Sequence, residues 1–312
     1  MRIGIDILGG DYAPEATVRG SIMAHESLRD KAIIVLFGDS NRITEICRQE
    51  KFDAANFDIV HTDINIGMDE YPAKAFSKKP EASIPLGFSY LKKGLIDGFA
   101  SAGNTGAMLV GAIQVVRSIP GVLRPCITAS MPKKSGKHTL LLDVGLNPDC
   151  KPDVLYQYGI LGSLYAELVY GIKEPRVALF NLGTEEEKGN LLTKASFQAM
   201  KGTTDFNFIG NAEGTDIFRN DIDVIVCDGF VGNTILKTAE AFYMLFHKKE
   251  TKDPYLEKFN YENYGGTPIL GINAPAIIGH GISGPQAIKN MIIHTANVAE
   301  AGLTEKIKQA FE

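Results

Sequence analysis

Short, almost continuously apolar runs alternate with amphipathic runs along most of the chain. Runs rich in Val, Ile and Leu are typical of parallel strands buried on both faces, and the segments between them carry apolar residues at helical spacing. This alternation predicts an α/β fold with a doubly wound, mostly parallel sheet. The expected strands cover residues 2–8, 32–38, 57–62, 138–144, 176–182, 206–210 and 223–228. The expected helices cover residues 14–29, 104–117, 152–170, 184–201 and 232–247.

The length of 312 residues fits one large α/β domain or two closely joined ones, and we expect a single domain over residues 1–312. Two stretches depart from the alternating pattern: residues 64–81 read as an exposed loop, and a protruding arm is expected at about 245–264. A net charge of -5 argues against a nucleic-acid partner, because such proteins usually carry a basic stripe. No window approaches about 18 continuous apolar residues, so no membrane span is predicted.

The cysteines at 47, 126, 150 and 227 are scattered, and none forms a C-x-x-C pair. A zinc site is therefore not expected, and no second acid stands at metal-ligand spacing from Asp143. Scattered cysteines indicate free thiols in a reducing cytosol. Asp143 ends an apolar run, and we expect its carboxylate to accept hydrogen bonds from a loop or a neighbouring strand.

Two glycine-bearing turns combine DGF with GNT. In DGFASAGNTGA, Asn104 and Thr105 head an expected helix, whose small residues would let it pack closely on a neighbour. In VCDGFVGNTIL, Gly229 and Gly232 would let the backbone approach a ligand, and Asn233 would supply a side-chain donor. Backbone N–H groups at a helix head bind anions readily. Asn is also a favoured N-cap, so either motif alone remains open to a structural explanation.

The stretch FNLGTEEEKGN follows another expected strand. Thr184 and Glu187 have the spacing of a capping box, which would start a helix there. Lys188 would then lie one turn into that helix, where it could reach an anion at the sheet edge. A solvated surface lysine is the competing interpretation.

The C-terminal part contains GHGISG, a literal G-x-G-x-x-G at residues 279–284. The dinucleotide fingerprint also needs a following βαβ unit, whereas the remaining residues read as one long helix. The motif therefore does not predict NAD binding. It leaves His280 and Ser283 on a glycine loop before a helix, where a histidine is more often structural than catalytic. No nucleophile elbow, H-E-x-x-H pair or Walker lysine is present, so covalent catalysis is not favoured.

Taken together, the motifs resemble those of the PlsX family of phosphate acyltransferases. The matching stretches are DILGGDYAP, SAGNTGA, LLLDVGLNPDC, ALFNLGTEEEKGN, VCDGFVGNTILK, YGGTPILGI and HGISGPQAIKN. The resemblance implies a fold related to phosphotransacetylases and isopropylmalate dehydrogenases, a homodimer and no cofactor. It implies transfer of a fatty acyl group from acyl carrier protein (ACP) to inorganic phosphate. The acyl phosphate would then feed a membrane glycerol-3-phosphate acyltransferase in phospholipid synthesis.

The resemblance places the catalytic residues at Lys188 and Asn233. The predicted phosphate- and substrate-binding residues are Asn104, Thr105, Gly229, Gly232, His280 and Ser283. We expect these groups to contribute to one phosphate site. Which of Lys188 and Asn233 holds the phosphate, and which the carbonyl oxygen, stays open.

Members of this family often carry a basic, hydrophobic hairpin before the YGG motif, where it is thought to touch the membrane. Here the arm is short, and its four lysines are offset by three glutamates and an aspartate. That balance argues against membrane contact through the arm. The expected location is cytoplasmic, with peripheral contact at the inner membrane face left open. The segment AFYMLF, 241–246, is expected to lie in the core or in a dimer contact, and an exposed apolar patch is the alternative.

Other functions remain to be distinguished. A phosphotransacetylase-like enzyme that uses acyl-CoA would need the same site residues. An NAD-dependent decarboxylating dehydrogenase would need clustered aspartates for a metal, which the sequence lacks. A non-enzymatic scaffold for lipid synthesis also fits. An acidic ACP would dock on basic residues, for which the lysine pairs 78–79, 92–93 and 133–134 are candidates, each with a solvated face as the alternative.

Overall fold

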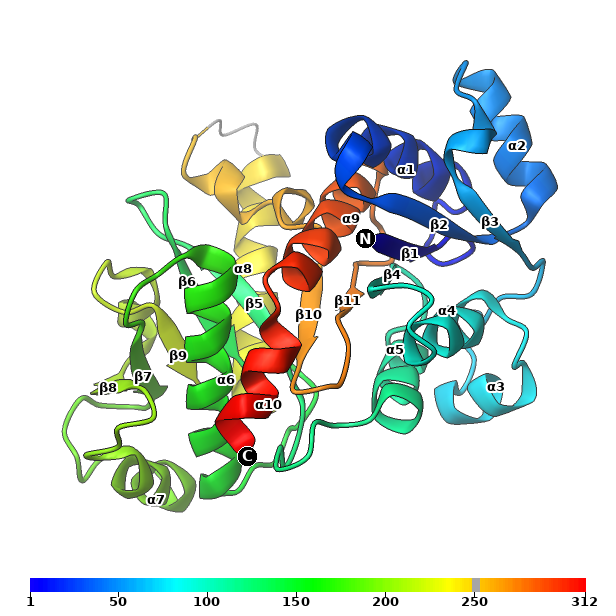
Figure 1. The fold of residues 1–312 in the computed structure, drawn as a ribbon. Helices are drawn as coiled ribbons and strands as arrows, with labels where there is room; N and C mark the ends of the chain where they lie inside the picture. Colours follow the sequence, from blue (N-terminus) through cyan, green and yellow to red (C-terminus); the bar gives the residue numbers. More distant parts are fainter. Residues whose placement is uncertain (249–252) are drawn as a thin grey trace. The chain divides into compact units, whose positions relative to one another are not determined.

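The computed structural model describes residues 1–248 and 253–312, which group into two compact units (Figure 1). Unit 1 contains Met1–Ser118 and Tyr261–Glu300. Unit 2 contains Ile119–Asn260 and Ala301–Glu312. The expected arm at 245–264 includes residues 249–252, which lie outside the described residues.

Unit 1 is built on a sheet with strand order β3-β2-β1-β4-β11-β10. Neighbouring strands are parallel except β10, which is antiparallel to β11. The parallel strands place the ends of β1, β4 and β11 at one edge of the sheet. The strands are β1 (Arg2–Asp6), β2 (Ile33–Gly38), β3 (Asp58–His61), β4 (Gly98–Ser101), β10 (Thr267–Leu270) and β11 (Ala276–Ile278).

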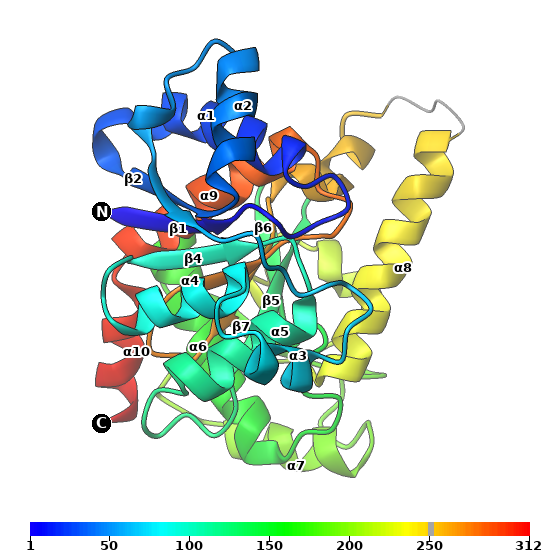
Figure 2. The ribbon, with the colours of Figure 1, turned by 90° about the vertical axis from the view of Figure 1, so that its right-hand side faces the viewer.

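Helices cover both faces of the unit 1 sheet. α1 and α9 pack side by side on one face, and α4 lies on the other with α5 (Figures 1 and 2). A side chain at Gly111 would overlap the ring of Phe88 in α4, so the small residues of the 105–116 segment allow close packing, as predicted. The helices are α1 (Glu15–Leu28), α2 (Ser40–Gln49), α3 (Pro72–Lys78), α4 (Ser83–Lys92), α5 (Thr105–Val110) with a π-helical continuation (Gly111–Val116), and α9 (Pro285–Glu300).

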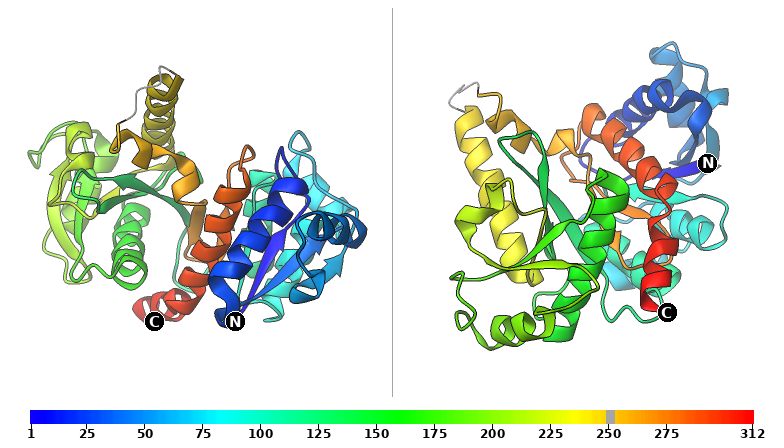
Figure 3. Two further views of the ribbon diagram at one scale, coloured as in Figure 1. Left: turned by 90° about the horizontal axis from the view of Figure 1, so that it is seen from above. Right: turned by 60° about the vertical axis from the view of Figure 1, so that its left-hand side comes forward.

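Unit 2 has strand order β5-β6-β9-β7-β8, parallel except for β5 beside β6. α6 and α8 lie on opposite faces of this sheet (Figure 3). The strands are β5 (Cys126–Pro132), β6 (His138–Leu142), β7 (Arg176–Phe180), β8 (Asn207–Ala212) and β9 (Val224–Val226). The helices are α6 (Pro152–Tyr170), α7 (Leu191–Met200), α8 (Gly229–Lys248) and α10 (Leu303–Phe311).

The predicted α/β architecture is confirmed, with several local corrections. Residues 64–81 are not all loop, because they contain α3. The last segment forms two helices, α9 and α10, rather than one. The core placement of 241–246 is wrong for its largest side chains, since Phe242, Met244, Leu245 and Phe246 are exposed. In the described part of the chain, no helix is both long and apolar enough to span a bilayer.

Candidate active site

Three loops of unit 2 leave the same edge of its sheet. β6, β9 and β7 are neighbouring parallel strands, so their carboxyl ends lie together. Asp143 directly follows β6, α8 with Asn233 follows β9, and the loop that carries Lys188 follows β7. This is the edge at which open α/β sheets usually bind ligands.

Asp143 organises the first of these loops. Its carboxylate is fully buried and accepts hydrogen bonds from the N–H of Ile127 on β5 (3.0 Å), and from the N–H groups of Leu146 (3.2 Å) and Asn147 (2.6 Å). The predicted role of Asp143 as an acceptor for a loop and a neighbouring strand is confirmed. Burial raises the pKa of Asp143, while these hydrogen bonds lower it. The network fixes the 143–147 loop against the sheet.

α8 begins on this fixed loop. Asp228 caps it by accepting the N–H of Val231 at 2.9 Å, and the N–H of Gly229 donates to the Asn147 carbonyl at 2.8 Å. A methyl group at Gly232 would lie 2.9 Å from the Asp143 carbonyl carbon and nearer still to its oxygen. The prediction of a helix head at Gly232 is therefore wrong: α8 starts at Gly229, and Gly232 lets its first turns pack against the Asp143 backbone.

Asn233 lies just beyond this contact, on the exposed side of the first turns of α8. A methyl group at Gly145 would lie 3.5 Å from Asn233 Oδ1, so the amide borders the Asp143 loop. No hydrogen bond joins its side chain to another of the described residues. An amide that is held by a rigid backbone and has a free donor is suited to bind an oxyanion.

Lys188 lies on a loop, and the predicted capping box at Thr184 is wrong. α7 begins at Leu191, and its cap is Asn190, whose side chain accepts the N–H of Thr193 at 2.9 Å. The helix starts later because Gly189 has a φ of +101°, a conformation that interrupts helical structure. The Lys188 ammonium is exposed and makes no ion pair with the described residues.

Asn181 holds the Lys188 loop and was not found by sequence reasoning. Its side chain is 6% exposed, accepts the N–H of Leu182 at 2.9 Å and donates to the Lys188 carbonyl at 3.1 Å. An Asn directly after a strand, followed by a loop that closes on Gly189, is the signal that could have identified it. Asn181 thus orients the backbone of Lys188 and leaves the Lys188 side chain free.

The other candidates lie in unit 1. Asn104 caps α5 by accepting the N–H of Ala107 at 3.0 Å, and its amide donates to the carbonyls of Gly67 (2.8 Å) and Glu70 (3.2 Å). These bonds occupy its side chain with the 67–70 loop. Thr105 is the first residue of α5 and is exposed.

His280 and Ser283 follow β11 in unit 1. The N–H of Ser283 donates to the His280 carbonyl at 3.0 Å, and the His280 ring packs on Tyr261 with centroids 4.9 Å apart. The Gly281 carbonyl accepts the N–H of Asp11 at 2.7 Å, so this loop also touches the loop after β1. The structure thus divides the site candidates between unit 1 and unit 2.

The cysteines are free, as predicted, and burial raises the pKa values of Cys126 and Cys227 well above the ordinary range. Such thiols are poor nucleophiles at neutral pH. Among residues 1–248 and 253–312, no group of three or more His, Cys, Asp or Glu side chains is placed to hold a metal ion. At this edge of the unit 2 sheet, the site candidates that keep a free donor are the Asn233 amide and the Lys188 ammonium.

A family model described as "Fatty acid synthesis protein" matches residues 1–248. A protein named "Phosphate acyltransferase" from Caldicellulosiruptor saccharolyticus is 39% identical to the chain, over 99% of this chain and 98% of the relative. The chain belongs to the phosphate acyltransferase family. The predicted PlsX resemblance is thereby confirmed, and the chain is an acyltransferase.

A second phosphate acyltransferase, from Thermoanaerobacterium thermosaccharolyticum, is 39% identical over 100% of this chain and 97% of its own length. Among solved structures, a phosphotransacetylase from Streptococcus pyogenes has a TM-score of 0.70 at 18% identity, covering 96% of this chain and 94% of its own. A branched-chain phosphotransacylase from Enterococcus faecalis has a TM-score of 0.63 at 15% identity, over 96% of this chain and 99% of its own. The phosphotransacetylase-like fold prediction is confirmed.

Proposed function

We propose that this member of the phosphate acyltransferase family transfers a fatty acyl group from acyl-ACP to inorganic phosphate. The product would be an acyl phosphate for phosphatidic acid synthesis, consumed by a membrane glycerol-3-phosphate acyltransferase. The observation that carries the proposal is the pair of exposed donors, Lys188 and Asn233, beside neighbouring strands β7 and β9. Family membership supplies the reaction class.

In the proposed reaction a phosphate oxygen attacks the thioester carbonyl carbon. A C–O bond forms, the C–S bond breaks, and the thiolate of the carrier departs with its electron pair. Phosphate is largely dianionic near neutral pH, so no activated serine or cysteine is needed. This fits a site whose donors are an ammonium and an amide and whose buried thiols stay protonated. No cofactor takes part.

Lys188 and Asn233 are proposed as the catalytic residues. One holds the non-attacking oxygens of the phosphate, and the other stabilises the charge that develops on the carbonyl oxygen, an effect worth about 3–4 kcal/mol per donor. Gly229 and Gly232 are proposed to contribute through the fixed start of α8. In unit 1, Thr105, His280 and Ser283 are proposed to bind substrate.

Asn104 is proposed to position the substrate-binding loop of unit 1, because its own side chain is already hydrogen-bonded to the 67–70 loop. Its substitution would then raise KM more than it lowers kcat. Of the lysines considered for ACP docking, Lys133 is fully buried and pairs with Asp223, so it is not a docking residue.

We also propose that the protein acts in the cytoplasm and forms a homodimer. The support for the dimer is the exposed apolar face of α8, where Phe242 and Leu245 line an open groove of about 450 Å³. Leu245→Glu would give a monomer in analytical ultracentrifugation, whereas Lys194→Glu, at an exposed position of α7 outside this groove, would not. A dimer that persists in Leu245→Glu would place the interface elsewhere.

The donor is tested by comparing turnover of acyl-ACP and acyl-CoA at equal phosphate. We expect a higher kcat/KM for acyl-ACP. A preference for acyl-CoA would instead favour a phosphotransacetylase-like function, which the same site chemistry would support. A protein with no phosphate-dependent turnover of either thioester would be a scaffold.

A further inference from the structure

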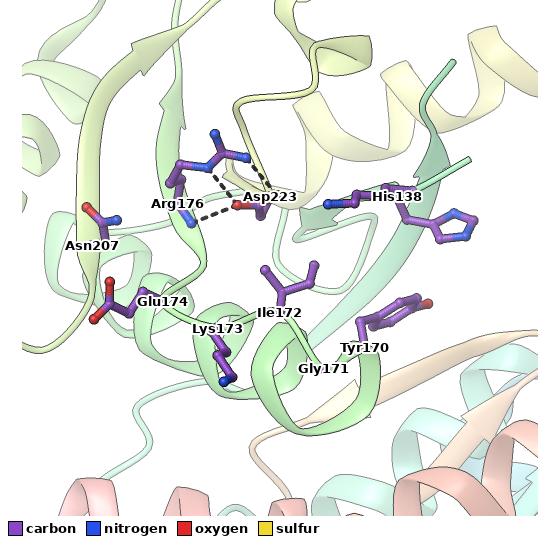
Figure 4. A pocket seen from close by; sticks show the side chains of 10 residues that line it. His138, Tyr170, Gly171, Ile172, Lys173, Glu174, Arg176, Asn207 and Asp223 are labelled. Atoms are coloured by element: carbon purple, nitrogen blue, oxygen red, sulfur yellow. Dashed lines mark hydrogen bonds and ion pairs between the residues drawn. The ribbon is translucent and has the colours of Figure 1, made fainter. Parts of the chain in front are cut away.

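A pocket of about 580 Å³ opens at the amino ends of the unit 2 strands, within the size range of ligand sites (Figure 4). His138 begins β6, Arg176 begins β7, Asn207 begins β8, and Asp223 immediately precedes β9. Residues 170–174, from the last residue of α6 into the loop before β7, form another side of it. This edge is opposite to the one that carries Lys188, so the pocket is separate from the candidate active site of unit 2.

Two cations contact Asp223, one of the two acids that line this pocket. Asp223 is 4% exposed, and its carboxylate contacts Arg176 Nε at 2.9 Å and Lys133 Nζ at 3.2 Å. Burial alone would raise the pKa of Asp223, but its bonds to Arg176 and Lys133 outweigh burial and lower it. One carboxylate therefore faces two cations, which leaves one positive charge beside the pocket.

Two further cations are available. Lys137 and Lys173 line the pocket, are exposed, and have no acidic partner among the described residues. Glu174 is the other acid of the lining. The four cations thus exceed the two carboxylates by two positive charges.

Part of the remaining lining is apolar, whereas His138 and Asn207 are polar. Ile172 contributes an aliphatic side chain. The Tyr170 hydroxyl is engaged with Ser130 Oγ at 2.6 Å, so Tyr170 offers its ring rather than a free hydroxyl. An apolar wall next to excess positive charge favours a ligand with an apolar body and an anionic group.

We propose that this pocket binds a small organic dianion of the phosphate monoester class at a site separate from the active site. The phosphoryl group would lie against Lys137, Lys173 and Arg176, and the organic part against Ile172 and Tyr170.

Phenyl phosphate is the probe, used above its second pKa of about 6 so that it is a dianion. Its binding to the full-length protein is measured by calorimetry in a buffer without inorganic phosphate, which would compete for the same cations. Lys137→Glu and Lys173→Glu reverse a pocket charge at exposed positions where folding is not at risk. Lys194→Glu, an exposed lysine of α7 outside the pocket, is the matched control.

We expect saturable one-site binding that weakens with salt. Each pocket variant should weaken it about tenfold or more, and Lys194→Glu should leave it within about twofold. Absence of saturable binding to the wild type would overturn the proposal. So would equal affinities in the wild type and both pocket variants, because the probe would then bind elsewhere.

Discussion

One methyl group added at Gly232 should lower both the stability of unit 2 and the rate of the reaction. In Gly232→Ala the new Cβ would lie 2.9 Å from the Asp143 carbonyl carbon and 3.0 Å from Cys227 Sγ. Ordinary carbon contacts lie near 3.5–4.0 Å, so α8 must move by roughly 1 Å. Asp143 cannot yield easily, because its loop is held by the hydrogen bonds from Ile127, Leu146 and Asn147.

Overpacking of this kind costs about 1–3 kcal/mol of unfolding free energy. The shift also moves Asn233, the next residue, and a displacement near 1 Å in an active site lowers turnover by about 100-fold. The assay is acyl phosphate formation at saturating substrate, with urea unfolding of the same sample. Gly214→Ala is the matched control, because nothing lies within 4 Å of its added Cβ. Wild-type turnover and stability in Gly232→Ala would refute the placement of α8 against Asp143.

Three further predictions concern the catalytic candidates, a buried ion pair and a buried histidine. Lys188→Ala and Asn233→Ala should each lower kcat about 100-fold or more with unchanged urea unfolding, and a near-normal rate would remove that residue from the mechanism. Asp223→Asn leaves Lys133 buried without its partner and should cost about 3–5 kcal/mol in urea unfolding, whereas Asp221→Asn, at an exposed pair with Arg219, should cost under about 1 kcal/mol. Burial lowers the pKa of His294 to about 4, so the unfolded chain takes up the proton first as the pH falls from 6.5. The free energy of unfolding should then drop by about 2–3 kcal/mol between pH 6.5 and about pH 4. His294→Gln should remove most of this pH dependence.

The strands buried on both faces could be predicted because their sequences are nearly continuous in Val, Ile and Leu. β4, with the sequence GFAS, and β5, with CITASMP, were missed because Gly, Ser, Thr and Pro interrupt their apolar pattern. Tertiary pairing with β1 and β6 makes them strands despite that composition. Such pairing joins segments that are far apart in the chain, so it cannot be predicted from the sequence of the strand alone.

The site residues could be selected from motifs, but their roles needed coordinates. Thr184 has a good capping-box spacing, yet Asn190 caps α7 because Asn181 and the backbone of Gly189 hold the preceding loop away from a helix. Gly232 in sequence suggested an anion cradle, and in space it faces a protein carbonyl. Lys133 resembled a surface lysine, because its partner Asp223 is 90 residues away in the chain.

The most direct test of the account is the phosphate dependence of carrier release. Purified protein is mixed with acyl-ACP at increasing inorganic phosphate, and the free ACP thiol and the acyl phosphate are measured together. The account predicts no ACP release without phosphate, saturation as phosphate rises, and one acyl phosphate for each ACP released. Release of ACP that is independent of phosphate, or that yields free fatty acid instead of acyl phosphate, would contradict it.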